Sequence, residues 1–191
     1  PVVASPSAIG SDYKAYIREF VDQIGTDYVS YDHYPLISNK NGNQIIENFL
    51  FNMKLVKQVA PEKDMWTFLQ SMQYGTNNRA LESSADATFQ VYSFLAMGGT
   101  GIQWFCYWSP PPYDGATRFG VACVDRDGSL SPAYDYVKTA NLELKGLENI
   151  YFNFDWQGAM PLIGSKNDNG GENKNFNYLL DTAIKSHDRI K

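Results

Sequence analysis

The chain has 191 residues, a formal net charge of −5 and a sequence pI of about 5.0, and it is long enough to bury the core of one domain. No run of Lys or Arg exceeds a pair, which excludes a basic surface for nucleic acid or anionic lipid. No apolar run reaches the roughly 20 residues that span a bilayer. Aromatic residues make up 15% of the chain, a composition that suits either a carbohydrate partner or a large core.

Residues 11–24 have apolar side chains at the three- and four-residue spacing of an amphipathic helix, and Gly25 supplies its stop. The stretch 27–37, DYVSYDHYPLI, is rich in aromatic and β-branched residues and predicts a strand that Pro35 ends. A polar turn over 38–42 then leads to a second predicted helix, which carries Ile45, Ile46, Phe49, Leu50, Met53 and Val56 on one face.

The middle of the chain repeats this alternation. Residues 65–72 predict a strand, residues 82–97 a helix that stops at a glycine-rich GGTG, and residues 101–108 (GIQWFCYW) a buried strand that ends at SPPP. Strands that alternate with helices favour βα units on a parallel sheet. The fold class predicted is therefore α/β.

The last part of the chain changes its pattern near Leu147. A turn at 125–128 and a helix over 132–147 complete the first unit, residues 1–147. Residues 148–191 are expected to form a short tail of strand, loop and helix, with IYFNFDW (150–156) as the strand, a polar loop over 164–175 and a helix over 176–187. This tail could be the start of a C-terminal β-domain.

The carboxyl end of the first long strand is the best candidate for a site. Ligands of α/β proteins bind where parallel strands end, and Tyr31, Asp32, His33 and Tyr34 lie at such an end. The alternative is a strand edge whose tyrosines pack and whose aspartate caps a turn. The sequence predicts no cofactor or metal, because the GGTG run lacks the Lys of a phosphate loop and 125–128 lacks the further acidic ligands of a calcium loop. Cys106 and Cys123 have neither metal-site nor disulfide-framework spacing.

Four motifs follow one another in the first unit: SYDHYPL, WTFLQS, GGTGIQWFCYW and DRDGSLSPAYDYVKTANLELKGL. In this order and spacing they resemble the second half of a glycoside hydrolase (β/α)8 barrel, of the β-galactosidase and agarase-like kind. The resemblance covers residues 1–147 and implies a partial TIM barrel, with strands five or six to eight and their helices. Strands one to four would be missing, since a complete barrel takes about 250 residues.

The family's mechanism uses two carboxyl groups, an acid/base after strand four and a nucleophile at the end of strand seven. The resemblance places the first in the missing half and the second at Gln70, where an amide stands in place of the expected Glu. Two hypotheses follow. The chain is a glycoside hydrolase, or a fragment of one that is inactive alone, acting on β-linked neutral sugars. Alternatively, it is a non-catalytic carbohydrate-binding or scaffold module.

The resemblance also implies roles for individual residues. Asp32 and Tyr34 would share the inward face, with Asp32 as a sugar-hydroxyl acceptor or substitute catalytic carboxylate and Tyr34 as a substrate-binding donor to a carboxylate or ring oxygen. His33 is a further candidate for substrate binding if the strand twists at its end; otherwise its opposite parity predicts that it packs outward. Trp108, on the parity of the deeper Trp104, is the expected platform for a pyranose ring. Further substrate contacts, on a loop that could equally be a plain proline-stiffened rim, are Tyr113, Asp114 and Arg118.

The expected partner is an oligo- or polysaccharide. A half-barrel leaves its sheet edges uncovered, so we also expect a homodimer, the missing N-terminal barrel half, or a cap formed by the tail. The resemblance favours a secreted or periplasmic, bacterial-type protein. Residues 1–5 do not form a signal peptide, so either a signal was removed or the chain begins inside a longer one.

Overall fold

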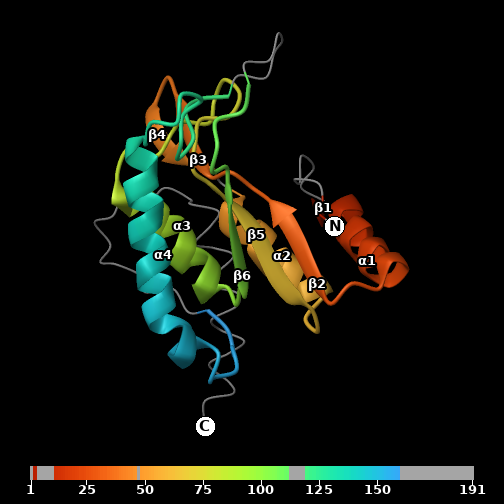
Figure 1. Ribbon diagram of the computed structural model, residues 1–191. Coiled ribbons are helices and arrows are strands. Elements are labelled where there is room, and N and C mark those ends of the chain that lie inside the picture. Colours follow the sequence, from red (N-terminus) through yellow and green to blue (C-terminus); the bar gives the residue numbers. More distant parts are fainter. Residues whose placement is uncertain (1, 4–10, 47, 112–118, 160–191) are drawn as a thin grey trace, which may run out of the picture.

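The computed structural model describes residues 2–3, 11–46, 48–111 and 119–159. Its centre is a four-stranded sheet in the order β1-β2-β5-β6, in which each neighbouring pair is parallel (Figure 1). The strands are β1 (Val2–Val3), β2 (Tyr28–Asp32), β5 (Asp64–Gln70) and β6 (Gly101–Phe105). The prediction of a parallel α/β sheet is confirmed. Strands β2, β5 and β6 end at Asp32, Gln70 and Phe105, earlier than the sequence pattern suggested.

Helices alternate with these strands along the chain. They are α1 (Ser11–Ile24), α2 (Phe49–Val59), α3 (Ser84–Ala96) and α4 (Pro132–Tyr151). Alternate residues of each strand point to opposite faces of the sheet. The register aligns Val29 with Met65 and Leu69 with Trp104, and these residues pack with the apolar stripes of the four helices. The helices therefore cover one face of the sheet, which we call the helix-covered face.

The opposite face bears large aromatic side chains. Tyr28 and Trp66 stack on it with ring centroids 4.5 Å apart. A Cβ atom at Gly101 would lie 2.5 Å from the Trp66 ring, so the first position of β6 accepts only glycine beside this tryptophan. Asp32 has the same parity as Tyr28, which places it at the carboxyl end of this face.

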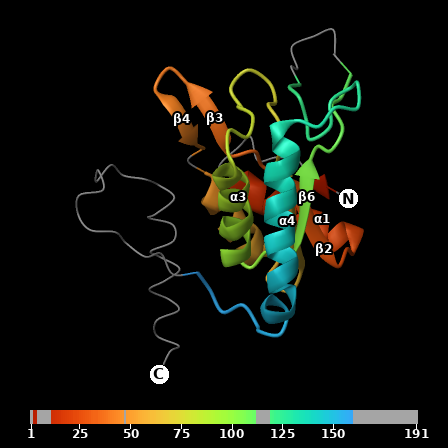
Figure 2. The same ribbon diagram turned by 60° about the vertical axis from the view of Figure 1, so that its left-hand side comes forward.

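A small hairpin corrects the prediction for residues 36–46. The structure has an antiparallel pair, β3 (Leu36–Asn39) and β4 (Gly42–Ile45), where the sequence suggested a turn followed directly by a helix. The expected helical start at Ile45 was wrong, and α2 begins at Phe49. Lys40 and Asn41 form the hairpin turn, and Gly42, at a φ of 96°, begins β4 opposite Asn39. Figures 1 and 2 show the hairpin beyond the carboxyl ends of the parallel strands.

The expected strand at 150–156 was also wrong. Helix α4 runs past Leu147 to Tyr151, and residues 152–159 follow it without forming a strand, at the amino ends of the sheet strands (Figure 2). Residues 125–128 form the predicted turn, closed by a hydrogen bond from the Gly128 N–H to the Asp125 carbonyl at 2.9 Å. The predicted loop at 164–175 and helix at 176–187 lie outside the described residues. Among the described helices, none has the length and apolar character needed to cross a bilayer.

Candidate functional site

Four aromatic rings meet at the carboxyl end of the sheet, each from a different segment. Tyr34 follows β2, Tyr74 follows β5, Phe105 ends β6, and Phe119 comes from the loop beyond it. Ring centroids are 5.6 Å apart for Tyr34 with Tyr74, 5.6 Å for Tyr34 with Phe105, and 5.6 Å for Tyr74 with Phe119. We call these four residues the aromatic cluster. They give the site flat apolar faces with two phenol groups among them.

Asp32 supplies the carboxyl group beside this cluster. Its side chain is half-buried, and this burial raises the pKa of Asp32, while an interaction with the Tyr34 phenol acts in the opposite direction. Burial also raises the pKa of Tyr34, and the negative charge of Asp32 adds to that effect. The Asp32 carboxyl group and the Tyr34 phenol therefore interact electrostatically, as their shared strand parity predicts.

Tyr13, on α1, comes close to the same carboxyl group. Its pKa is raised first by burial and then by the charge of Asp32. Its hydroxyl is buried without a hydrogen-bond partner among the described residues, as is the hydroxyl of Tyr31. Sequence reasoning placed Tyr13 in the core only, because its helical spacing indicates a buried face and carries no information about which strand residue it meets.

His33 faces α2. It is 5% exposed, its Nδ1 lies 2.9 Å from Nδ2 of Asn52, and its ring centroid is 5.9 Å from that of Phe49. Burial lowers the pKa of His33 to about 4, so the ring is neutral near pH 7. An Asn52 amide beside Nδ1 is consistent with a neutral ring that accepts a hydrogen bond there. The position matches the expectation that His33 packs outward, away from the aromatic cluster.

Gln70 is 1% exposed and its carboxamide is bonded to main-chain groups. Its Oε1 accepts a hydrogen bond from the Leu36 N–H at 3.0 Å. Its Nε2 donates to the carbonyl oxygens of Arg79 at 2.6 Å, Met72 at 3.3 Å and Leu36 at 3.4 Å. A carboxylate here would lack the donors and would face three carbonyl oxygens. The amide that stands at the expected nucleophile position is the group that this environment needs.

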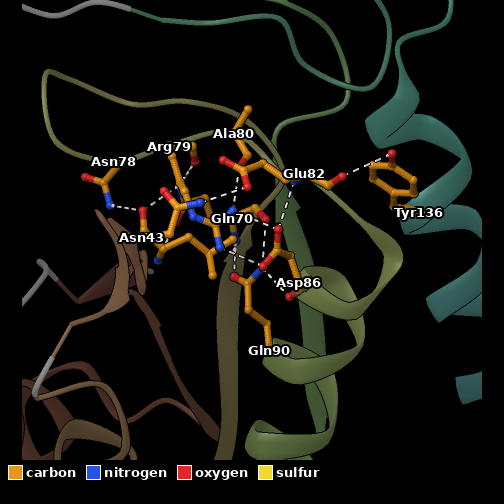
Figure 3. Close-up of polar contacts among 10 residues, drawn as sticks. Asn43, Gln70, Asn78, Arg79, Ala80, Glu82, Asp86, Gln90 and Tyr136 are labelled. Atoms are coloured by element: carbon orange, nitrogen blue, oxygen red, sulfur yellow. Dashed lines mark hydrogen bonds and ion pairs between the residues drawn. The ribbon is translucent and has the colours of Figure 1, made fainter. Parts of the chain in front are cut away.

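Figure 3 shows that Gln70 belongs to a wider polar network that ties the loops together. The Gln90 side chain exchanges two hydrogen bonds with the Gln70 main chain, at 2.8 and 3.0 Å. Arg79 and Asp86 form a bidentate ion pair with both distances at 2.7 Å. Burial alone would raise the pKa of Asp86, but hydrogen bonds from Arg79 and nearby N–H groups hold it below its ordinary value.

The same network reaches three other elements. The Asn78 side chain donates to the Tyr34 carbonyl at 3.0 Å, and the Asn43 side chain of β4 donates to the Glu82 carboxylate at 2.8 Å. The Tyr136 hydroxyl of α4 donates to the Glu82 carbonyl at 3.3 Å. The network therefore holds the main chain at Tyr34, and with it one edge of the aromatic cluster.

Trp104 and Trp108 differ in their surroundings. Trp104 points to the helix-covered face, where its Nε1 donates to Asn141 of α4 at 2.9 Å. Trp108 lies beyond the end of β6, is 52% exposed, and its main chain forms a bridge with Val124. Both cysteines are free thiols. Tyr113, Asp114 and Arg118 lie outside the described residues.

The sequence reasoning missed three members of the aromatic cluster. Phe105 was assigned to the opposite parity from the expected sugar platform, and the register of Gln70 with Phe105 is what reverses this assignment. Tyr74 and Phe119 lie in loops, where no periodicity marks a side chain, and an antiparallel bridge between their main chains brings them together. Chemically, the arrangement offers apolar ring faces, phenol groups and one carboxyl group with a raised pKa.

No protein-family model matches the chain, and no curated protein sequence matches it. Its fold is similar to that in the crystal structure of a β-galactosidase from the psychrophilic Marinomonas ef1, with a TM-score of 0.53 and 16% sequence identity. The match covers 75% of this chain and 23% of that chain, so this chain spans about a quarter of the β-galactosidase. The likeness concerns the fold alone, which is glycoside hydrolase-like.

Proposed function

We propose that this chain is the carboxyl-terminal part of a glycosidase-type (β/α)8 barrel and binds β-linked neutral sugars at the carboxyl ends of β2, β5 and β6. The observation that supports this most strongly is the aromatic cluster beside Asp32. A pyranose ring has one apolar face, which stacks on aromatic rings, and hydroxyl groups that can donate hydrogen bonds to a carboxylate. In this proposal Asp32 accepts from a sugar hydroxyl, Tyr34 donates to a ring or hydroxyl oxygen, and Trp108 extends the platform.

Hydrolysis is the first candidate activity. A retaining glycosidase needs two carboxyl groups roughly 5 Å apart. Asp32 supplies one, as the carboxylate that substitutes for the nucleophile expected at Gln70. The second, the acid/base, would come from an amino-terminal barrel half. On this proposal the protein is secreted or periplasmic, where polysaccharides are encountered.

Sugar binding without catalysis is the second candidate, and Gln70 favours it. Its carboxamide is committed to main-chain groups, so the position expected for a nucleophile is filled by a structural amide. A site of this kind would keep the aromatic platform and the hydroxyl acceptor and would release no product.

Calorimetric titration with a β-linked neutral disaccharide tests the site. We expect Asp32→Asn to weaken binding by about tenfold or more, because the hydrogen bonds lost are to a charged group. Tyr34→Phe should weaken it by a few-fold, roughly the worth of one neutral hydrogen bond. The matched controls are Asp27→Asn and Tyr28→Phe, which make the same chemical changes near the amino end of β2 and should leave affinity unchanged.

Product release separates the two candidates. Release of the aryl group from an aryl β-glycoside by the longest natural form, abolished by Asp32→Asn, supports hydrolysis. Binding without turnover supports the non-catalytic module. Equal affinity of the site variants and their controls, or no binding of any neutral sugar, would contradict the proposed site altogether.

A further inference from the structure

The amino end of the sheet has a second feature, an open pocket of about 740 Å³. Its walls come from the end of α2, the turn between α3 and β6, and the residues that follow α4. Four large apolar side chains stand exposed within seven residues here: Ile150 at 62%, Phe152 at 65%, Phe154 at 75% and Trp156 at 38%. We call Ile150, Phe152, Phe154 and Trp156 the amino-end patch. Exposed apolar side chains that gather around one pocket are typical of an interaction site.

Hydrogen bonds hold the base of this pocket in place. The Trp156 Nε1 donates to the Ala96 carbonyl at 2.8 Å, and the Tyr151 hydroxyl donates to the carbonyls of Leu95 and Gly99 at 2.9 and 2.8 Å. The Trp156 ring lies over Gly98, where a Cβ atom would meet it at 2.8 Å, and Gly98 has a φ of 81°. These bonds satisfy carbonyls at the end of α3 and fix the ring positions before any partner arrives.

The chain itself supplies a segment that fits this surface. In the sequence beyond Ala159, apolar residues recur at Phe176, Leu179, Leu180, Ala183 and Ile184, the spacing of a helix with one apolar stripe. An amphipathic helix that lays such a stripe into an apolar groove is a common recognition mode. The pocket continues into a second one of about 430 Å³ along α4, with which it shares Thr100, Tyr151 and Phe152.

The short connecting chain between Ala159 and Phe176 favours residues 176–184 over other occupants of the amino-end patch. The described chain ends at Ala159, which is buried in the core next to the pocket-lining Gln157. Residues 160–175 then join it to the apolar stripe; they are sixteen residues long, polar and glycine-containing from Gly164 on, and as a flexible chain they reach about 22 Å. A tethered segment meets its site at an effective concentration on the order of millimolar, which a second copy or a free ligand does not match.

We propose that residues 176–184 bind the amino-end patch as a helix and cap this end of the sheet. This inference goes beyond the sugar site, which lies at the other end of the strands, and does not depend on it. The contact is an intramolecular docking between two stretches of one chain, so it is independent of protein concentration.

Hydrogen exchange of the full-length chain, read by mass spectrometry, tests the docking. The wild type should show slowed exchange over residues 150–157 and over 176–185. Leu180→Asp places a charge in the apolar stripe and should speed exchange in both segments by about tenfold or more. Thr182→Asp introduces the same side chain on the opposite side of the segment and should leave both unchanged. Amides of β5 report whether each variant is folded.

A reciprocal variant completes the test. Phe154→Asp should speed exchange over 176–185, whereas Tyr107→Asp, at a 63% exposed aromatic position elsewhere, should not. Unprotected exchange over 176–185 in the wild type would overturn the proposal, as would equal exchange in Leu180→Asp and Thr182→Asp. Protection that appears only as protein concentration rises would also overturn it, because that result assigns the patch to a second copy.

Discussion

The two ends of the parallel sheet differ in how side chains bond to the main chain and in how far the aromatic residues are exposed. At the carboxyl end, polar side chains such as Gln70 and Asn78 bond to the main chain of neighbouring loops, and the Tyr34 ring that they position is partly buried. At the amino end, Tyr151 and Trp156 cap carbonyls of α3 and its following turn, and the adjacent aromatic residues stay exposed. The carboxyl end therefore has a geometry fixed within the described residues, which suits a small ligand. The amino end offers an apolar surface, which suits a polypeptide.

The substitution Gln70→Glu should have the largest effect on the carboxyl end of the sheet. The new carboxylate would lose the Nε2 donors and face the carbonyls of Leu36, Met72 and Arg79 in a site that is 1% exposed. We expect a loss of about 4 kcal/mol in the free energy of unfolding at pH 7, measured by urea denaturation. The variant should not gain glycosidase activity, because the new group is directed at the main chain.

The pH dependence of this variant has a defined sign. Burial and the carbonyls would raise the folded-state pKa of the introduced carboxyl group above its ordinary value of about 4.3, so the folded state binds the proton more tightly. Stability should therefore return as the pH falls toward that raised pKa. Gln58→Glu, the same change on an exposed position of α2, should show little loss. A Gln70→Glu protein as stable as the wild type at pH 7 would show that the network does not fix the carboxyl end.

The two ends also differ in what the sequence could predict. The amphipathic spacing of residues 11–24 predicted the bounds that α1 has in the structure, because helix periodicity is a local property. The strand at Tyr28–Asp32 and the position of Asp32 at its end were likewise predictable. The role of Gln70 was not, because its partners lie up to 34 residues away and are main-chain groups that carry no sequence signal.

Two errors have identifiable causes. The hairpin at Leu36–Ile45 was taken for a turn and the start of a helix, although Asn41-Gly42 between two short apolar-edged runs is a hairpin signal. Residues 150–156 alternate like a strand, but Ile150 and Tyr151 continue a helix whose face packs on α3, and tertiary packing prevails over the local pattern.

A second prediction concerns the pH dependence of stability that His33 causes at the carboxyl end. Burial lowers its pKa to about 4, below the ordinary value of about 6.5 for an unfolded chain. The unfolded state therefore binds the proton first, and His33 costs stability as the pH falls from 6.5 toward 4. Between pH 7 and pH 5 this should amount to about 2 kcal/mol.

His33→Gln isolates this contribution. Other groups titrate in the same range in both proteins, so the difference between wild type and variant reports the imidazole. We expect the variant to lose about 2 kcal/mol less than the wild type between pH 7 and pH 5 in urea denaturation. A nuclear magnetic resonance titration of the His33 ring with a midpoint near 6.5 would contradict the buried, neutral ring against Asn52.

The smallest expected effect compares two Arg–Asp pairs within the molecule. Arg79–Asp86 is bidentate with side chains 12% and 16% exposed, whereas Arg18–Asp22 on α1 has side chains 45% and 58% exposed. Breaking a buried pair costs several kcal/mol and a surface pair very little, and the residual solvent contact of Asp86 reduces its share. We expect Asp86→Asn to lower the free energy of unfolding by about 1 kcal/mol at pH 7.

The sign of the pH dependence distinguishes this pair from a packing effect. The pKa of Asp86 lies below its ordinary value, so the pair stabilises the fold at neutral pH and this stabilisation is lost as the pH falls below about 4. The gap between wild type and Asp86→Asn should therefore close at acid pH. Asp22→Asn, the matched control, should produce a smaller change throughout. A gap for Asp86→Asn that stays constant from pH 7 to pH 3 would mean that the loop network depends on the shape of this side chain and not on its charge.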